Sequence, residues 1–315
     1  MENTVKIRKN SEFGTAGYCL AVFLFLLYFQ VIGLYGLKFA VGAITSWVTG
    51  GIMWVIRILF QKAEDEEGVD KPFGWLIFLL FPLFIPLAMP LWIIPFVLLG
   101  CYFISIAAFG GHGRHIFNPV IVAVVFMLYG YGATGVLNAS RPLSIPNAGY
   151  RIWTAGVPPR ADIRDVFASV SSSDIIDASF KGLIPNIPGS CFGLVILIAS
   201  LVLALLFRRR IHWWLVAVGS VCTFAWLLPQ HPDLAMPPIN ALLLGIMPSL
   251  ILCGIADFTT LPESVSGQII HAILFGVFAV LMLFNSADIL APAYGFLLAQ
   301  VISPLVIDVL GVKHE

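Results

Sequence analysis

Apolar runs long enough to cross a lipid bilayer recur along almost the whole chain, and they constrain its fold more than any single motif does. A transmembrane helix needs about 20 mainly apolar residues, and ten segments come close to that length. Because the bilayer core offers no water to the backbone, each span must be helical. The expected spans are residues 15–36, 38–60, 73–88, 90–109, 117–132, 190–207, 211–228, 239–256, 266–284 and 287–310.

The composition agrees with these spans. The chain has 315 residues, of which 59% are hydrophobic and 11% are charged, whereas soluble domains carry roughly 25% charged residues. The sequence therefore predicts an all-α polytopic membrane protein. The formal net charge of zero gives no electrostatic reason to expect a nucleic-acid partner. The five cysteines stand singly, without a CxxC pair, so neither a disulfide framework nor a metal site is predicted.

The basic residues predict an orientation. Cytoplasmic loops of membrane proteins are enriched in lysine and arginine, and one side of the predicted topology collects most of these residues. Both termini are therefore expected in the cytoplasm and residues 133–187 outside it. The lysines and arginines within this loop do not oppose the prediction, because charge governs the side of long translocated loops only weakly. The residues on the predicted cytoplasmic side are Lys6, Arg8, Lys9, Lys62, Lys71, Arg114, Arg208, Arg209, Arg210 and Lys313.

The long loop at residues 133–187 divides the ten expected spans into five and five. Because five is odd, the second half enters the membrane from the opposite side, which is the arrangement of an inverted repeat. The predicted units are a five-helix repeat at 1–132, an extracytoplasmic loop at 133–187 and a second five-helix repeat at 188–315. Prolines interrupt the third and fourth spans of each half. Paired interruptions indicate a central site, although prolines are also simply better tolerated in membrane helices.

A glycine-rich joint, GGHGRHIFNPVI at residues 110–121, connects two of the spans. Glycines permit close backbone approach, and a proline such as Pro119 suits the first turn of a helix. We expect Gly110, Gly111 and Gly113 to pack against backbone or a cofactor, with Asn118 belonging to the same binding site. The alternative is an ordinary cytoplasmic loop that leads into a helix.

The segment GIADFTTLPE follows the proline-interrupted eighth span. Asp257, Thr259 and Thr260 offer the hard oxygen ligands that a sodium ion or a proton relay uses, and we expect them to line an ion path. The alternative is that Asp257 caps a turn or the next helix. Ser190, at the start of the sixth span, is expected to be the N-cap of that helix.

The order of these motifs resembles one family, which contains the D subunit of the Rnf complex and the B subunit of the sodium-pumping NADH:quinone oxidoreductase, Nqr. The joint GGHGRHIFNPVIV is similar to the family's GGLGxNxFNPA. KGLIPNIPGS, at residues 181–190, resembles the segment before the family's sixth helix, and GIADFTTLPESVSGQ, at 254–268, resembles MATDPVTSPxxxxGQ. The resemblance extends from about the second span to the end of the chain.

The resemblance implies an integral membrane subunit of a redox-driven sodium or proton pump in a bacterial inner membrane. Such a subunit transfers electrons across the membrane together with flavin and iron–sulfur subunits. Its other partners would be membrane lipid and, as a further candidate, quinone. Two alternatives stay open, because a fold does not fix a function: a non-redox transporter or channel with the same inverted-repeat fold, and a scaffold subunit of a larger complex.

The resemblance also implies a cofactor. Family members carry FMN joined through a phosphoester to a threonine in a DGxSGATPL motif. The corresponding region here reads SSSDIIDASFKGL, and an ungapped alignment places Ala178 and Ser179 at the Ala-Thr positions. Ser179 has the hydroxyl group that a phosphoester needs, so it is the expected site of covalent FMN. However, the Ser-Gly pair and the proline are missing and Asp174 is one residue out of register, so the alternative is a paralogue without this flavin.

Overall fold

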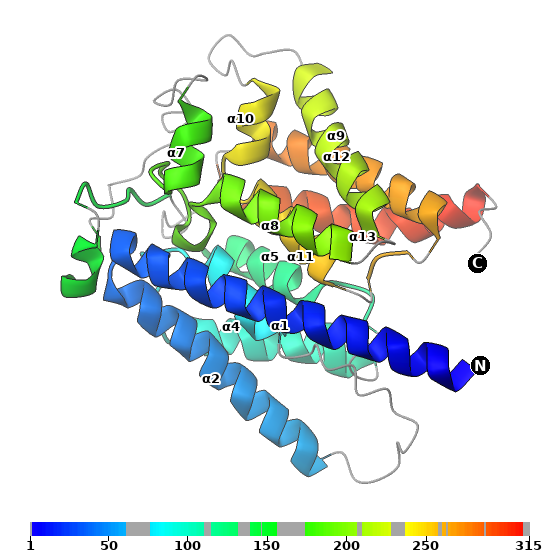
Figure 1. Ribbon diagram of the computed structural model, residues 1–315, viewed down its shortest axis with the longest axis horizontal. Coiled ribbons are helices and arrows are strands. Elements are labelled where there is room, and N and C mark those ends of the chain that lie inside the picture. The colour runs from blue at the N-terminus through cyan, green and yellow to red at the C-terminus, as the bar shows by residue number, and fades with distance from the viewer. Residues whose placement is uncertain are drawn as a thin grey trace.

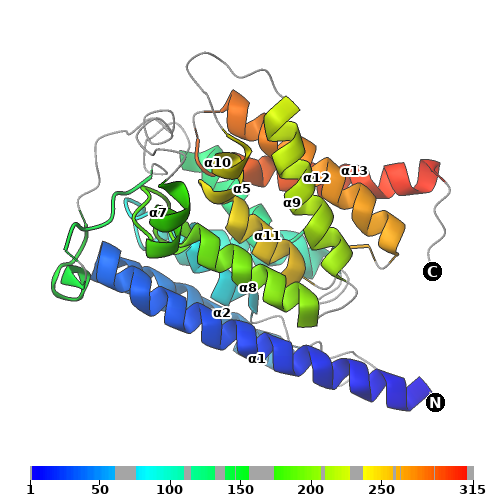
Figure 2. The same ribbon diagram turned by 45° about the horizontal axis from the view of Figure 1, so that its top comes forward.

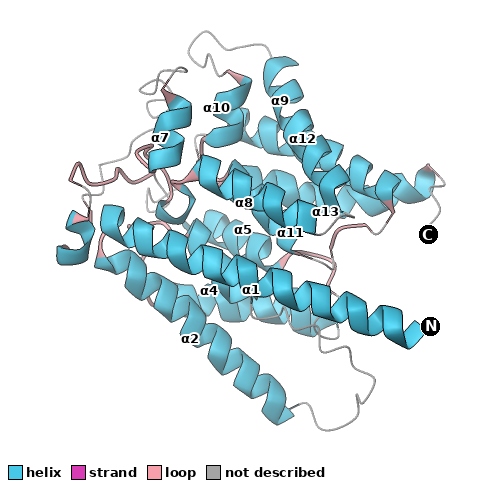
Figure 3. Ribbon diagram, in the orientation of Figure 1, coloured by secondary structure: helices cyan, strands magenta, loops and turns pink. Residues whose placement is uncertain are grey.

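In the computed structural model of the chain, the elements of the described residues are helices joined by loops and turns (Figure 3), as the sequence predicted. Within these ranges no strand occurs, and the one isolated β-bridge joins Ser140 to Asn186. The described residues are 2–60, 76–109, 115–131, 139–145, 147–155, 174–206, 210–227, 237–257, 260–262, 264–286 and 288–310.

The first half contains two long helices followed by interrupted ones. Proline lacks the backbone N–H that a continuing helix needs, and the prolines at 82, 86 and 90 coincide with the interruption after η1. The elements are α1 (Glu2–Tyr35), α2 (Leu37–Phe60), α3 (Leu76–Leu80), the 3-10 helix η1 (Phe81–Phe84), α4 (Ile93–Cys101), the π-helical η2 (Tyr102–Ile106), the 3-10 helix η3 (Ala107–Phe109) and α5 (Pro119–Tyr131).

Short helices precede the longer helices of the second half. They are η5 (Ala148–Arg151), α7 (Ile175–Lys181) and η6 (Pro188–Ser190). The longer helices that follow are α8 (Gly193–Leu206), α9 (Ile211–Leu227), α10 (Pro238–Leu243), α11 (Met247–Ala256), α12 (Val265–Asn285) and α13 (Pro292–Val309).

The helices depart from the expected spans at two interruptions. The third expected span, 73–88, ends its helical part at Phe84, and the eighth, 239–256, is two helices, α10 and α11. Between these two, Gly245 adopts φ +63°, a left-handed conformation that favours glycine. Among the described residues, three helical segments are long and apolar enough to cross a membrane: Gly17–Tyr35, α12 and α13. By length and composition, the chain is a multi-pass membrane protein.

The helices form a bundle with α8 and α11 between two outer groups (Figures 1 and 2). Helices α1 and α2 run along one side, whereas α9, α12 and α13 form the other. Helix α12 packs against α9 and α13, α11 packs against α8, and α5 packs against α13. Both termini lie at one end of the bundle, and residues 139–155 lie at the opposite end.

A buried polar cluster at the end nearer residues 139–155 joins the interrupted helices of the two halves. The Ser190 hydroxyl donates to the carbonyl oxygen of Leu83 at 2.7 Å and shares a 2.7 Å hydrogen bond with the Ser249 hydroxyl. The side-chain amide of Asn186 donates to the carbonyl oxygens of Ser190 at 3.0 Å and Gly245 at 2.8 Å. Carbonyls that the helix interruptions release are therefore bound by side chains.

We expect Ser190→Ala to lower the free energy of unfolding by about 1–3 kcal/mol, because the Leu83 carbonyl and the Ser249 hydroxyl would lose a partner in a buried environment. Thermal unfolding of the detergent-purified chain would show this loss, followed with a thiol-reactive dye on Cys101, Cys191 and Cys253, which are buried in the folded state. The matched control is Ser144→Ala at an exposed position. Equal melting temperatures for the two variants would contradict the prediction.

Candidate functional site

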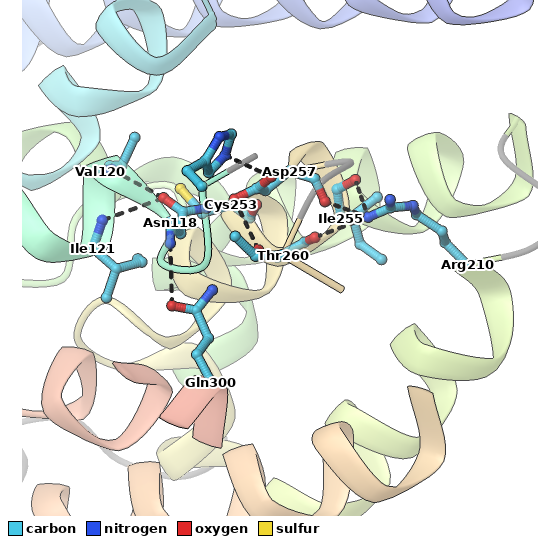
Figure 4. A network of polar contacts seen from close by, with 11 residues as sticks. Asn118, Val120, Ile121, Arg210, Cys253, Ile255, Asp257, Thr260 and Gln300 are labelled. Carbon is cyan, nitrogen blue, oxygen red and sulfur yellow. Dashed lines mark hydrogen bonds and ion pairs between the residues drawn. The ribbon is translucent and has the colours of Figure 1, made fainter. Parts of the chain in front are cut away.

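The candidate site lies where α5 begins and α11 ends (Figure 4). Asn118, of which only 2% is exposed, precedes α5. Its side-chain oxygen accepts hydrogen bonds from the backbone N–H groups of Val120 at 2.9 Å and Ile121 at 3.3 Å. Asn118 thereby satisfies the free N–H groups of the first turn of α5. Pro119 is the first residue of α5, as the sequence predicted.

Asn118 also links α5 to two helices of the second half. Its backbone N–H donates to Oε1 of Gln300 in α13 at 3.1 Å, and its side-chain amide donates to the carbonyl oxygen of Cys253 in α11 at 3.4 Å. Both ends of the side-chain amide are thus bound to protein backbone. Asn118 holds the start of α5 against the last turn of α11.

Asp257, the first residue after α11, places a carboxylate in this buried region. Its Oδ1 lies 3.5 Å from Nε2 of His115, and its Oδ2 accepts a 2.8 Å hydrogen bond from the Thr260 hydroxyl. The side chains of His115 and Asp257 are only 7% and 9% exposed. The structure therefore brings Asp257 and Thr260 together, and it adds His115 from the glycine-rich joint.

Arg210 places a positive charge at the end of α11 (Figure 4). Its guanidinium Nη1 donates to the carbonyl oxygen of Asp257 at 2.5 Å and to those of Gly254 and Ile255 at 3.4 Å each. The last carbonyls of a helix have no partner within it and carry a partial negative charge. The sequence indicated only that Arg210 belongs to a basic run on the predicted cytoplasmic side, and it gave no signal for this contact.

The interpretation of Asp257 as a cap of the next helix is wrong. Helix α12 begins at Val265, and the Ser264 hydroxyl accepts from the backbone N–H of Gly267 at 3.2 Å, so Ser264 is its N-cap. Asp257 instead occupies the position after the last residue of α11.

Ser179, the expected flavin site, lies at the other end of the bundle and is fully buried. Its hydroxyl oxygen accepts a hydrogen bond from the backbone N–H of Leu194, in the first turn of α8, at 2.9 Å. Ser179 therefore caps α8 from a neighbouring helix. The prediction that Ser190 is this N-cap is wrong, because Ser190 lies in η6 and its hydroxyl donates to Leu83.

The surroundings of Ser179 do not fit covalent FMN in the described structure. A phosphoester needs space for a phosphate next to the hydroxyl oxygen, and this oxygen already faces the backbone of α8. A Cβ atom built on Gly193 would come within 2.9 Å of the Ser179 hydroxyl and within 2.6 Å of the Leu243 carbonyl. Ser179 is itself fully buried, so a phosphate on its hydroxyl would require these close-packed neighbours to move.

Several residues that the sequence singled out lie outside the described residues: Gly110, Gly111, Gly113 and Thr259. Asp288 lies in the turn between α12 and α13. Within the described part of the chain, no group of three or more His, Cys, Asp and Glu side chains is placed to hold a metal ion.

Comparison with known proteins identifies relatives of the chain. The family model described as "NQR2, RnfD, RnfE family" matches residues 2–313. The B subunit of Na(+)-translocating NADH-quinone reductase from two strains of Klebsiella pneumoniae is 26% identical over 280 residues, which are 81% of this chain and 61% of each relative. The same protein from Yersinia pestis is 28% identical over 218 residues, or 63% of this chain and 48% of the relative. The chain thus spans about three fifths or less of the length of these relatives.

We expect Ser179→Ala to lower the free energy of unfolding by about 1 kcal/mol, because the N–H of Leu194 loses its cap. The thiol-dye melting assay would measure this change, with Ser144→Ala as the exposed control.

We also expect the intact mass of the purified wild-type chain to equal that of the polypeptide alone. An added mass of one FMN that disappears in Ser179→Ala would contradict the assignment of Ser179 as a structural cap.

Proposed function

Because the chain belongs to the NQR2, RnfD and RnfE family, we propose that it is a membrane subunit of an Rnf/Nqr-type redox complex. The complex would couple electron transfer across a bacterial inner membrane to translocation of Na+ or H+. Its other members would be flavin and iron–sulfur subunits, with quinone as a candidate electron acceptor.

One observation carries the proposed role of this chain: the buried carboxylate of Asp257 at the end of the short helix α11. In membrane transporters, the ends of interrupted helices and nearby polar side chains commonly bind the translocated ion. A buried ionisable residue in such a protein is most often functional, because burial of its charge is costly. We infer that Asp257 and Thr260 line the ion path, together with Thr259, and that His115 positions the carboxylate.

We propose that the two halves are inverted repeats of five spans each, with both termini in the cytoplasm. Two observations support this arrangement. Both termini lie at one end of the bundle (Figure 1). The sequence HIFNP at 115–119 leads into α5, and the similar DILAP at 288–292 leads into α13. Each half thus begins its last helix at the proline that ends a similar pentapeptide.

A second candidate is a non-redox channel or scaffold subunit, and the capped, buried Ser179 favours it. A visible absorbance spectrum of the purified complex discriminates the candidates, because a redox complex carries absorbing cofactors and a channel does not. The redox proposal would fail if the chain purified only with colourless partners.

We expect Asp257→Asn to assemble normally and to reduce Na+ uptake by proteoliposomes of the complex by about tenfold or more, because the path loses its buried negative charge. Asparagine keeps an oxygen that can accept from Thr260, so the local fold is preserved. Asp308→Asn, at an exposed position of α13, is the control. Native uptake by the Asp257→Asn complex would place the ion path elsewhere.

The proposed orientation predicts that Ser144→Cys reacts with a membrane-impermeant maleimide in intact cells, because Ser144 is exposed at the end opposite the termini. Leu310→Cys, exposed at the end of the last helix, should react only after the cells are permeabilised. The opposite pattern would invert the topology.

A further inference from the structure

Helix α11 ends inside the protein. Each of its residues from Met247 to Ala256 is buried, so its last carbonyl oxygens have little access to water. Unpaired carbonyls in such an environment are costly. Three carbonyl oxygens at this end, those of Gly254, Ile255 and Asp257, receive hydrogen bonds from the Arg210 guanidinium. The end of α11 therefore already binds a cationic group, the guanidinium of Arg210.

We propose that the C-terminal end of α11 is a binding site for a monovalent metal ion, and that Arg210 is a tethered competitor that occupies this site until its side chain withdraws. The proposal rests on the proposed function, because it specifies how the ion path near Asp257 is opened and closed.

The ligand chemistry of the site suits a small hard cation. Arg210 binds carbonyl oxygens at the end of α11, and Asp257, which supplies one of them, also carries a carboxylate whose Oδ2 accepts from the Thr260 hydroxyl. In transporters, unwound carbonyls and the C-terminal ends of half-helices coordinate Na+. Among the described residues that form this site, the negative charge is that of the Asp257 carboxylate plus the partial charge of the helix end. This amount balances a single positive charge, so the site matches a monovalent ion better than a divalent one.

The position of Arg210 allows its side chain to leave the site without moving α11. Arg210 precedes α9, so it belongs to a different element from the carbonyls that it binds, and it is partly exposed. An arginine side chain is long and flexible and can extend its charged end toward water at a membrane interface. Its withdrawal would free three carbonyl oxygens and leave Asp257 paired with His115 and Thr260.

The competing interpretation is that Arg210 is a permanent cap of α11. Both interpretations predict that loss of Arg210 destabilises the protein, but they differ in what restores stability. If Arg210 is a permanent cap, its removal costs the protein these hydrogen bonds, and no particular metal ion restores the lost stability. A tethered competitor, once removed, leaves a site that metal ions fill, so a suitable cation stabilises the variant.

The test uses the full chain purified in detergent and the variant Arg210→Gln, which removes the charge and keeps a hydrogen-bond donor on a shorter side chain. Melting temperatures are measured with the thiol dye at constant pH and ionic strength, with NaCl, LiCl or KCl replacing choline chloride. We expect at least one of the metal ions to stabilise Arg210→Gln over choline. The apparent affinity for that ion should be about tenfold or more tighter than in the wild type, because removal of the competitor raises the fraction of binding-competent protein.

Two matched variants complete the test. Arg210→Lys keeps a tethered cation and should respond to metal ions like the wild type. The double variant Arg210→Gln with Asp257→Asn should lose the gained affinity, because it lacks the carboxylate of the site. The proposal is overturned if Arg210→Gln melts at the same temperature in all four salts, or if the double variant keeps the gain. It is also overturned if Arg210→Gln cannot be purified folded in any of the salts.

The assay separates this inference from the proposed function, since it involves no electron transfer. A cation-stabilised Arg210→Gln combined with a complex that shows no redox activity would reject the proposed function and keep the site. An active, ion-pumping complex whose Arg210→Gln chain ignores metal ions would reject the site and keep the function.

Discussion

Backbone groups released by interrupted helices must find partners inside an apolar protein, and this constraint shapes most of the structure. Helix η1 stops at Phe84, and α10 and α11 are separated by Gly245. The hydrocarbon core of a bilayer supplies no water to bind the carbonyl oxygens at these interruptions. Buried polar side chains supply the partners, since Ser190 binds the Leu83 carbonyl and Asn186 binds that of Gly245. Hydrogen bonds from these neighbouring side chains therefore stabilise the interruptions.

The partners connect the two halves of the chain. Ser190, at the start of the second half, binds a carbonyl of η1 in the first half. Asn118, at the start of the last helix of the first half, binds the Cys253 carbonyl of α11 in the second half. Each half thus completes hydrogen bonding that the other leaves open. A displacement of one interrupted helix must therefore disturb a helix start in the opposite half, which is a physical route for coupling the two ends of the molecule.

The sequence predicts the helices better than it predicts their contacts. The helices follow from the length of the apolar runs, and Pro119 begins α5 because proline suits a first turn. Asp257 and Thr260 could be paired in advance because they are close in the chain. Long-range contacts left no such signal: His115 reaches Asp257 from the opposite half, and Ser179 caps α8 across 15 residues. A count of positive charges could predict the side of the membrane for Arg210, but not its contact with α11.

The Arg210 contact would also resolve an electrostatic difficulty of the ion path that we propose. Burial of a charged group in a low-dielectric region costs several kcal/mol unless it is compensated, and the buried carboxylate of Asp257 is bound by His115 and Thr260. With the Arg210 guanidinium at the adjacent carbonyls, the region keeps a positive charge when no metal ion is present. In the exchange that we propose, a monovalent ion would replace the guanidinium, and one positive charge would take the place of another. The net charge of the buried region would then stay constant while the ion enters and leaves.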